Sequence, residues 1–349
     1  SPVAGDKVTI LNGDDITLTQ DEAAGAVIIN SGGTITGGGF EITLNDAAGT
    51  TYIFSSVGSG VAGKSAIEGI LDIAITGGST SRPINEAGTG GLNNLTINNA
   101  QIYTMLYHIN LSGNLTITAG TLNTQHGGAD KQLTVAGTTS ISGTLICNTS
   151  AITLGTGKTD GWALSIGTTG TFTGGSGIHI IGSISTTAWG SPSITLSSGA
   201  TTINSKYISN GYSINCAAGT TFAHGGGSVI MTYAGSTFAH GSGSVIMTYA
   251  GSTLIQFSGG TLAFNDFEYN ASGHTLTLES PISCAGDLYA NAGTIDTKSA
   301  ENNAITVTGQ LKVNGANGIL TGQLSAIEVR NVLINSGGTF THNGVLTIT

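Results

Sequence analysis

The sequence predicts an all-β protein, a single elongated parallel β-solenoid, and three observations lead to this fold class. Glycine supplies 56 of the 349 residues, against about 7% in average proteins. Charged residues make up only 8% of the chain, although hydrophobic residues make up 39%. Short alternating segments such as residues 115–118 (LTIT) recur throughout, each followed within a few residues by glycine. Alternation is typical of strands that bury one face, and glycine provides the positive φ that a tight corner needs.

The same composition excludes several other classes. Glycine does not fall at every third position and there are only 4 prolines, so the chain is not a collagen. Disordered chains are highly charged and poor in β-branched residues, whereas this chain has few charges and many β-branched residues. No apolar run approaches the roughly 20 residues of a membrane-spanning helix. We therefore expect no membrane span. The formal net charge is −10 and the sequence has no basic stripe, so we also expect no nucleic-acid binding.

Individual strands are predicted where apolar and polar residues alternate before a glycine corner. With about 17–20 residues per coil, the chain makes on the order of 18 coils. The alternative fold, an array of β-sandwiches, requires tight hairpins of the Asn-Gly or Asp-Gly kind at regular spacing. Such dipeptides are too few for the whole chain. The clearest predicted strands lie at residues 8–10, 115–118, 133–135, 275–278 and 305–308.

Two internal repeats support stacked coils. Residues 222–236 read FAHGGGSVIMTYAGS and residues 238–252 read FAHGSGSVIMTYAGS, so residues 222–252 form a near-exact tandem repeat with a period of 16. A longer repeat relates GNLTITAGTLNT at residues 113–124 to GDLYANAGTIDT at residues 286–297. Because each coil contacts only its neighbours, a solenoid accepts an inserted unit that a closed core does not. We therefore predict that Phe222 stacks on Phe238 and Tyr233 on Tyr249 in adjacent coils.

The repeats and the uniform strand pattern indicate one continuous β-solenoid over residues 1–349. Residues 51–91 are the least regular segment and carry a local concentration of charge. We interpret them as less regular coils with protruding loops, and not as a separate domain.

Paired carboxylates are the residues most relevant to an enzymatic function, because glycoside hydrolysis needs two carboxyl groups at a defined separation. Asp266 and Glu268 share a face if the segment around them is a strand, and they are the best such pair; the others are Asp14-Asp15 and Asp21-Glu22. The nearest basic residues in sequence are Lys206 and Lys298. We expect no catalytic, cofactor-binding or metal-binding residues, and hence no enzyme.

Three segments carry a resemblance to known proteins. The N-terminal GDKVTILNGDDITLT, the middle GNLTITAGTLNT and the C-terminal NVLINSGGTFTHNGVLTIT resemble the Gly/Thr-rich β-solenoid repeats of large bacterial and archaeal surface proteins and of phage structural fibres. The resemblance implies a stalk, fibre, adhesin or sheath element outside the cell: on the cell surface, in a secreted filament or in a virion. It carries no catalytic motif to this sequence.

The expected function is therefore that of a non-enzymatic extracellular structural protein, a stalk, a fibre or a filament subunit that associates head to tail. Neither terminal segment shows a cap, and an uncapped coil exposes a row of N–H and C=O groups to another strand. Either the chain is a piece of a longer solenoid, or the end of one copy stacks on the start of the next, and we favour stacking. The alternatives are an adhesin that binds a surface glycan or receptor and a carbohydrate-active β-helix enzyme. The residues predicted to form the assembly contact are Val8, Ile10, Val345, Leu346 and Ile348.

Overall fold

The computed structural model describes most of the chain. Along strands 221–223, 229–231, 244–247 and 253–255 it describes the backbone alone. The described residues are 2–3, 5–45, 51–56, 66–78, 81–86, 91–156, 158, 160–186, 191–205, 214–215, 221–223, 229–231, 244–247, 253–255, 262–264, 266–278, 281–298, 300–315 and 317–349.

Strands are the only regular elements among these residues, and they form a parallel β-solenoid of about 12 turns. The predicted fold class is confirmed. Parallel pairing is the rule because each coil returns the chain in the same direction, one strand further along the axis. The exception in the described part is a short antiparallel hairpin, in which Gln125 faces Asp130.

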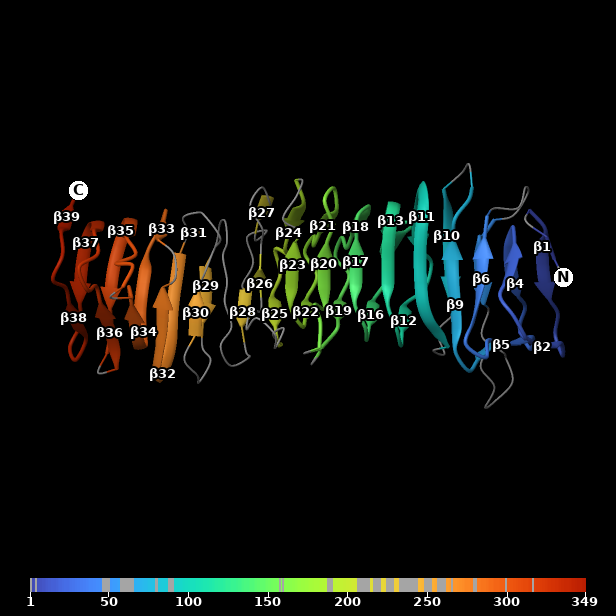
Figure 1. Ribbon diagram of the computed structural model, residues 1–349, viewed down its shortest axis with the longest axis horizontal. Coiled ribbons are helices and arrows are strands. Elements are labelled where there is room, and N and C mark those ends of the chain that lie inside the picture. Colours follow the sequence, from blue (N-terminus) through green and yellow to red (C-terminus); the bar gives the residue numbers. More distant parts are fainter. Residues whose placement is uncertain are drawn as a thin grey trace. The chain divides into compact units, whose positions relative to one another are not determined.

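Contacts divide the chain into two compact units. Unit 1 comprises residues 1–155 and 163–177, and unit 2 comprises residues 156–162 and 178–349. In both units the strands of successive coils lie side by side (Figure 1).

The strands of unit 1 are mostly three to five residues long, with a few longer ones that bend through a corner. They are β1 (Lys7–Ile10), β2 (Asp15–Thr17), β3 (Glu22–Ala24), β4 (Ala26–Ile29), β5 (Thr34–Thr36), β6 (Phe40–Leu44), β7 (Phe54–Ser56), β8 (Ile67–Glu68), β9 (Leu71–Ile75), β10 (Arg82–Glu86), β11 (Leu92–Met105), β12 (Ile109–Leu111), β13 (Leu115–Asn123), β14 (Gln125–His126), β15 (Ala129–Asp130), β16 (Leu133–Val135), β17 (Thr139–Ile141), β18 (Thr144–Ile146), β19 (Ile152–Leu154), β20 (Leu164–Ile166) and β21 (Thr171–Thr173).

The strands of unit 2 follow the same pattern. They are β22 (His179–Ile181), β23 (Ile184–Thr186), β24 (Ser193–Thr195), β25 (Thr201–Ile203), β26 (Ile214–Asn215), β27 (Thr221–Ala223), β28 (Val229–Met231), β29 (Ser244–Met247), β30 (Thr253–Ile255), β31 (Leu262–Phe264), β32 (Asp266–Leu278), β33 (Ile282–Cys284), β34 (Leu288–Asp296), β35 (Ile305–Val313), β36 (Gly318–Thr321), β37 (Ile327–Ile334), β38 (Thr339–Thr341) and β39 (Leu346–Ile348).

The core of unit 1 is a set of apolar columns that run along the coil axis. In one column Ile97 pairs with Ile117, Ile117 with Ile141, and Ile141 with Ile166, and all four side chains are buried. The polar residue between two inward positions points outward, as period-2 alternation requires. The core therefore consists of like side chains stacked one strand spacing apart.

Unit 2 repeats this construction near the C-terminus. One column runs through Ile282, Ile305 and Ile327, and a parallel one through Cys284, Val307 and Val329. The final strand continues both columns, because Leu346 pairs with Ile327 and Ile348 pairs with Val329.

Coil lengths vary far more than the sequence indicated. Among the parallel pairings of the described residues, the shortest spacing is that of the 16-residue repeat, in which Val229 pairs with Val245, whereas Phe40 pairs with Leu71 across 31 residues. The longest pairings fall in and around residues 51–91. The expectation of 17–20 residues per coil and of 18 coils was wrong for this reason: corners contain insertions, so fewer coils use the same chain. The predicted stacking of Phe238, Tyr233 and Tyr249 lies outside the described residues.

The longer internal repeat corresponds to a shared corner. Gly120 and Gly293 occupy equivalent positions, with φ of 77° and 81°. The preceding coil bulges opposite each of them, and a Cβ atom would lie 2.0 Å from the Asn99 carbonyl oxygen in one case and 2.2 Å from that of Ala271 in the other. Glycine is required there both for the left-handed backbone and for the close approach of the neighbouring strand.

Candidate functional site

The first coil of unit 1 exposes one edge of its strands. β1 pairs with β4, β2 with β5 and β3 with β6. Within the described residues no strand pairs with their other edges. A parallel edge of this kind offers N–H and C=O groups to a further strand.

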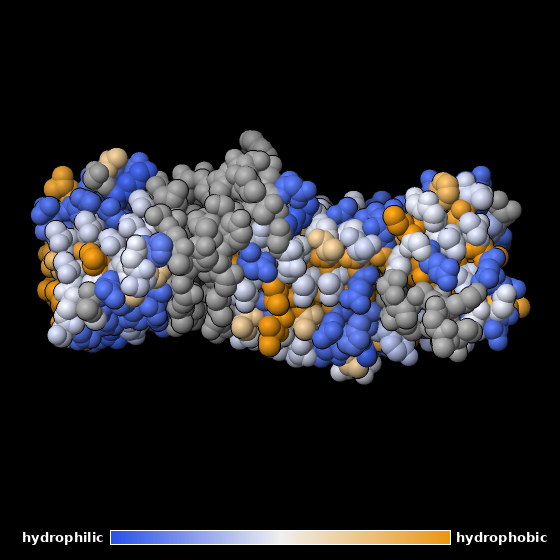
Figure 2. Space-filling view, turned by 90° about the horizontal axis from the view of Figure 1, so that it is seen from below, coloured by the Kyte–Doolittle hydropathy of each residue, from blue (hydrophilic) through white to orange (hydrophobic). Residues whose placement is uncertain are grey.

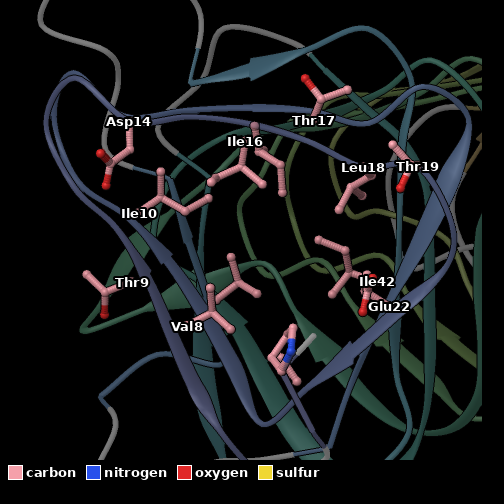
Figure 3. Close-up of a pocket in the computed structure, with 14 residues that line it drawn as sticks. Val8, Thr9, Ile10, Asp14, Ile16, Thr17, Leu18, Thr19, Glu22 and Ile42 are labelled. Atoms are coloured by element: carbon pink, nitrogen blue, oxygen red, sulfur yellow. The ribbon is translucent and has the colours of Figure 1, made fainter.

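A hollow opens into the core at this edge. It has a volume of about 300 Å³, and its walls include the inward side chains of β1, β2 and the following residues. Figure 3 shows Ile10, Ile16, Leu18 and Ile42 pointing into the space that the coil encloses. Ile16 is 44% exposed, although its partner Ile35 in the next coil is buried. The hollow is therefore the core cross-section, left open on one side.

The last coil of unit 2 exposes apolar core side chains at the free edge of its strands. Leu346 is 39% exposed and Ile348 is 64% exposed, although both continue columns that are buried in the three preceding coils. In Figure 2 hydrophobic residues reach the tip at the C-terminal end, on the left of the view. Within the described residues β38 and β39 pair only with β36 and β37. Apolar side chains thus stand at a free strand edge.

The five residues predicted for assembly lie at these two ends but in different environments. Val8 and Ile10 face the hollow, and Ile10 is only 3% exposed. Leu346 and Ile348 lie on the open end of the core, whereas Val345 is exposed outside the two core columns.

Sequence reasoning missed Ile16, which belongs to the same end. Asp14 accepts a hydrogen bond from the Leu11 N–H at 3.1 Å in the corner before β2, and Ile16 lies in that strand. The alternation Ile16-Thr17-Leu18 was the available signal.

Asp266 and Glu268 lie on the outward face of β32, because the residues between and after them, Phe267 and Tyr269, are buried. Asp266 accepts a hydrogen bond from the Asp287 N–H at 2.7 Å. Glu268 accepts one from the Asn291 side chain at 2.6 Å. Both carboxylates are thus held by the next coil, β34.

The structure brings a cation to this face that sequence distance did not indicate. Lys312 Nζ lies 2.6 Å from Asp287 Oδ2 and 3.2 Å from the Tyr289 hydroxyl, which itself donates to Asp287 at 2.9 Å. Burial raises the pKa of Asp287, but the hydrogen bonds from Lys312, the Gln310 N–H and Tyr289 outweigh it and hold the pKa below its ordinary value. The same hydrogen bond to Asp287 raises the pKa of Lys312.

An amide ladder completes this polar cluster. The Asn314 side chain donates to Asn291 at 2.5 Å, and the Asn335 side chain donates to Asn314 at 2.5 Å. The strand register explains this alignment, because Asn291, Asn314 and Asn335 each come directly after one of the paired residues Ala290, Val313 and Ile334. The carboxylates, the lysine and the amides therefore bind one another along the coil axis, which stabilises the stack.

The carboxylates of Asp21 and Glu22 also accept hydrogen bonds. Asp21 accepts one from the Glu41 N–H at 2.9 Å, and Glu22 accepts one from the Gln20 side-chain amide at 3.1 Å. Among the described residues no group of three or more His, Cys, Asp and Glu side chains could hold a metal ion. His224 and His240, the histidine pair of the 16-residue repeat, lie outside the described residues.

The two cysteines in the described part of the chain are buried free thiols. Burial raises the pKa of Cys147 well above its ordinary value. Burial, together with the nearby carboxylates of Asp266 and Asp287, does the same for Cys284. Both behave as small core residues.

No helix in the described part is long and apolar enough to traverse a bilayer. Comparison of the chain with protein-family models, with curated proteins and with solved structures found no match to any of them.

Proposed function

We propose that the chain is a non-enzymatic structural protein of an extracellular stalk or fibre, in which the first coil of one copy stacks on the last coil of another. The observation that carries the proposal is the pair of open ends: a hollow of about 300 Å³ in the first coil and exposed apolar side chains at the last strand edge.

The two ends are chemically suited to each other. Stacking would continue the parallel ladder and would bury Leu346 and Ile348 over the hollow that Val8, Ile10 and Ile16 line. Burying such side chains is favourable by about 25 cal/mol per Å² of apolar surface. Because the contact joins different surfaces of the two copies, it produces an open filament unless it closes into a ring.

Charge does not oppose this contact. The first 22 residues carry five acidic side chains and one lysine, whereas residues 331–349 carry no charged side chain. A neutral surface facing an acidic one meets no like-charge repulsion. The extracellular location rests on the resemblance to surface and fibre proteins.

A substitution in the last strand tests the stacking. Ile348→Lys places a charge on the core column at the open end, whereas Thr347→Lys places the same charge one residue earlier, on the outward face. We expect the wild-type chain and Thr347→Lys to sediment as large assemblies, and Ile348→Lys to sediment as a monomer with unchanged circular dichroism. Equal sedimentation of the two variants would contradict head-to-tail stacking.

The non-enzymatic part of the proposal is supported by the polar cluster, where Asp287 and Lys312 bind each other. Replacing Asp266 and Glu268 by their amides should leave every biological activity of the chain intact. A polysaccharide-cleaving activity that the double variant loses would overturn this part and leave the stacking untouched.

A further inference from the structure

Tyr107 is an exposed aromatic residue on the side of unit 1. It lies between β11 and β12 and is 48% exposed, and it is the one aromatic among the large exposed hydrophobic side chains of the described residues. An aromatic ring at a corner provides a rigid apolar face with little conformational entropy to lose. The apolar C–H face of a sugar ring packs well on such a surface.

Lys131 places a cation next to this ring. Its Nζ atom lies 6.0 Å from the ring centroid of Tyr107, at the outer limit of a cation–π contact. The neighbouring carboxylate of Asp130 is taken up by hydrogen bonds from Thr149 and Gln125. Lys131 forms no direct ion pair with a described carboxylate. Hydrogen bonds from Thr149 are the largest cause of the lowered pKa of Asp130, and the nearby charge of Lys131 adds to it, so an anion at Lys131 would share its ammonium group with Asp130.

A histidine links the two corners that carry Tyr107 and Lys131. The Nδ1 atom of His108 accepts a hydrogen bond from the Gln132 N–H at 2.8 Å, which assigns the ring proton to Nε2. The Ile109 N–H in turn donates to the Gln132 carbonyl at 3.0 Å. These bonds hold the corners of two successive coils together, and the exposed imidazole keeps its Nε2–H as a donor.

Asn110 extends the surface along β12. Its side chain is exposed, between the buried residues Ile109 and Leu111, and it makes no hydrogen bond with the described residues. It follows Tyr107 by three positions, at most about 11 Å along an extended chain. It also lines a groove of about 310 Å³, together with Gly69, Gly91, Leu92, Leu111 and Ser112.

From this arrangement we infer that unit 1 binds an acidic saccharide across Tyr107, Lys131 and Asn110. The tyrosine ring receives the apolar face of one sugar, the lysine binds a carboxylate or sulfate, and the asparagine amide binds hydroxyl groups of the next sugar at the groove. A few polar groups around an apolar platform fix the orientation of such a ligand. The site lies on the side of the coils, so the inference does not rest on head-to-tail stacking.

The experiment is calorimetric titration of the full chain with a hexamer of galacturonic acid. A neutral hexamer of glucose and a hexaglutamate peptide serve as comparison ligands. We expect the acidic saccharide to bind at least about tenfold more tightly than either, a difference of about 1.4 kcal/mol. Its affinity should fall as salt is added, because the cation is near the surface.

Variants assign the binding to the proposed residues. Lys131→Gln and Tyr107→Ala should each weaken binding at least about tenfold, whereas Tyr107→Phe should retain it within about threefold. Lys7→Gln, which removes another exposed cation of unit 1, is the matched control and should bind as the wild type does. Ile348→Lys should also bind normally, since the end of the coil is not involved.

Four results would overturn the inference. They are no binding of the acidic hexamer, equal binding of the neutral hexamer, equal or tighter binding of the peptide, and undiminished binding in both Lys131→Gln and Tyr107→Ala. Circular dichroism of each variant checks that the coils are intact, and the exposed positions make misfolding a small risk.

Discussion

The ion pair of Asp287 and Lys312 on the outer face of unit 2 makes a contribution to stability that depends on pH. Asp287 has a lowered pKa and Lys312 a raised one, and each owes the shift in part to the other. A carboxyl group with a lowered folded-state pKa stabilises the protein above its unfolded pKa, and this contribution is lost as the pH falls through the folded value. A lysine with a raised pKa contributes below its unfolded pKa, and its contribution is lost as the pH rises through the folded value.

The first prediction follows from this pair. Lys312→Gln should lower the free energy of unfolding by about 1 kcal/mol between about pH 4 and pH 10. Lys298→Gln removes a more exposed ion pair with Glu301, and it should cost less than about 0.5 kcal/mol. Denaturant unfolding at several pH values measures both. An equal cost in the two variants, or a Lys312→Gln cost that does not shrink below pH 4, would contradict the assignment.

The second prediction concerns the buried thiols. Because burial raises the pKa of Cys147 and Cys284, neither thiol forms the reactive thiolate at neutral pH. We expect N-ethylmaleimide to leave both unmodified in the native chain and to label both in denaturant, as peptide mass spectrometry will show. Labelling of the native chain at the rate of a free thiol would mean that these coils open.

At the scale of elements, the strands could be predicted from the sequence, whereas the lengths of the corners between them could not. The strands near residues 115–118 and 305–308 could be predicted because alternation is a local property. Coil length could not be predicted, because an insertion at a corner leaves the alternation of the flanking strands unchanged. The same limit hid the partnership of Asp287 with Lys312, which depends on how many residues lie between two strands that stack.

The third prediction tests one corner. Gly273 and Gly120 have the same φ of 77°, but a Cβ atom on Gly273 would meet nothing within 4 Å, whereas one on Gly120 would clash with the Asn99 carbonyl. Gly273→Ala should therefore cost about 1 kcal/mol for the left-handed backbone alone. Gly120→Ala and Gly293→Ala should each cost substantially more.

Thermal unfolding of these three variants provides the measurement. If Gly120→Ala and Gly273→Ala lower the melting temperature equally, the close approach of the coils at Gly120 contributes nothing to its requirement for glycine. If Gly293→Ala is neutral, the two corners of the longer repeat are not equivalent.

At the scale of the whole molecule, the two ends of the coil stack carry the surfaces proposed for assembly. Much of this end surface could be predicted from sequence, since Leu346 and Ile348 alternate as strand residues do. The hollow at the first coil could not be predicted from the sequence. It forms because Ile16 and Leu18 of the first coil and Ile42 of a following coil surround the same space. Stacking with another copy would cover the apolar surface at both ends.

Electron cryomicroscopy of the purified wild-type chain will show whether copies of the chain stack end to end. The account predicts unbranched fibres in which β1 of one copy lies one strand spacing, about 4.8 Å, from β39 of the next, with the β-ladder continuous across the boundary. Separate particles at high concentration, or fibres whose copies join through the sides of their coils, would contradict it.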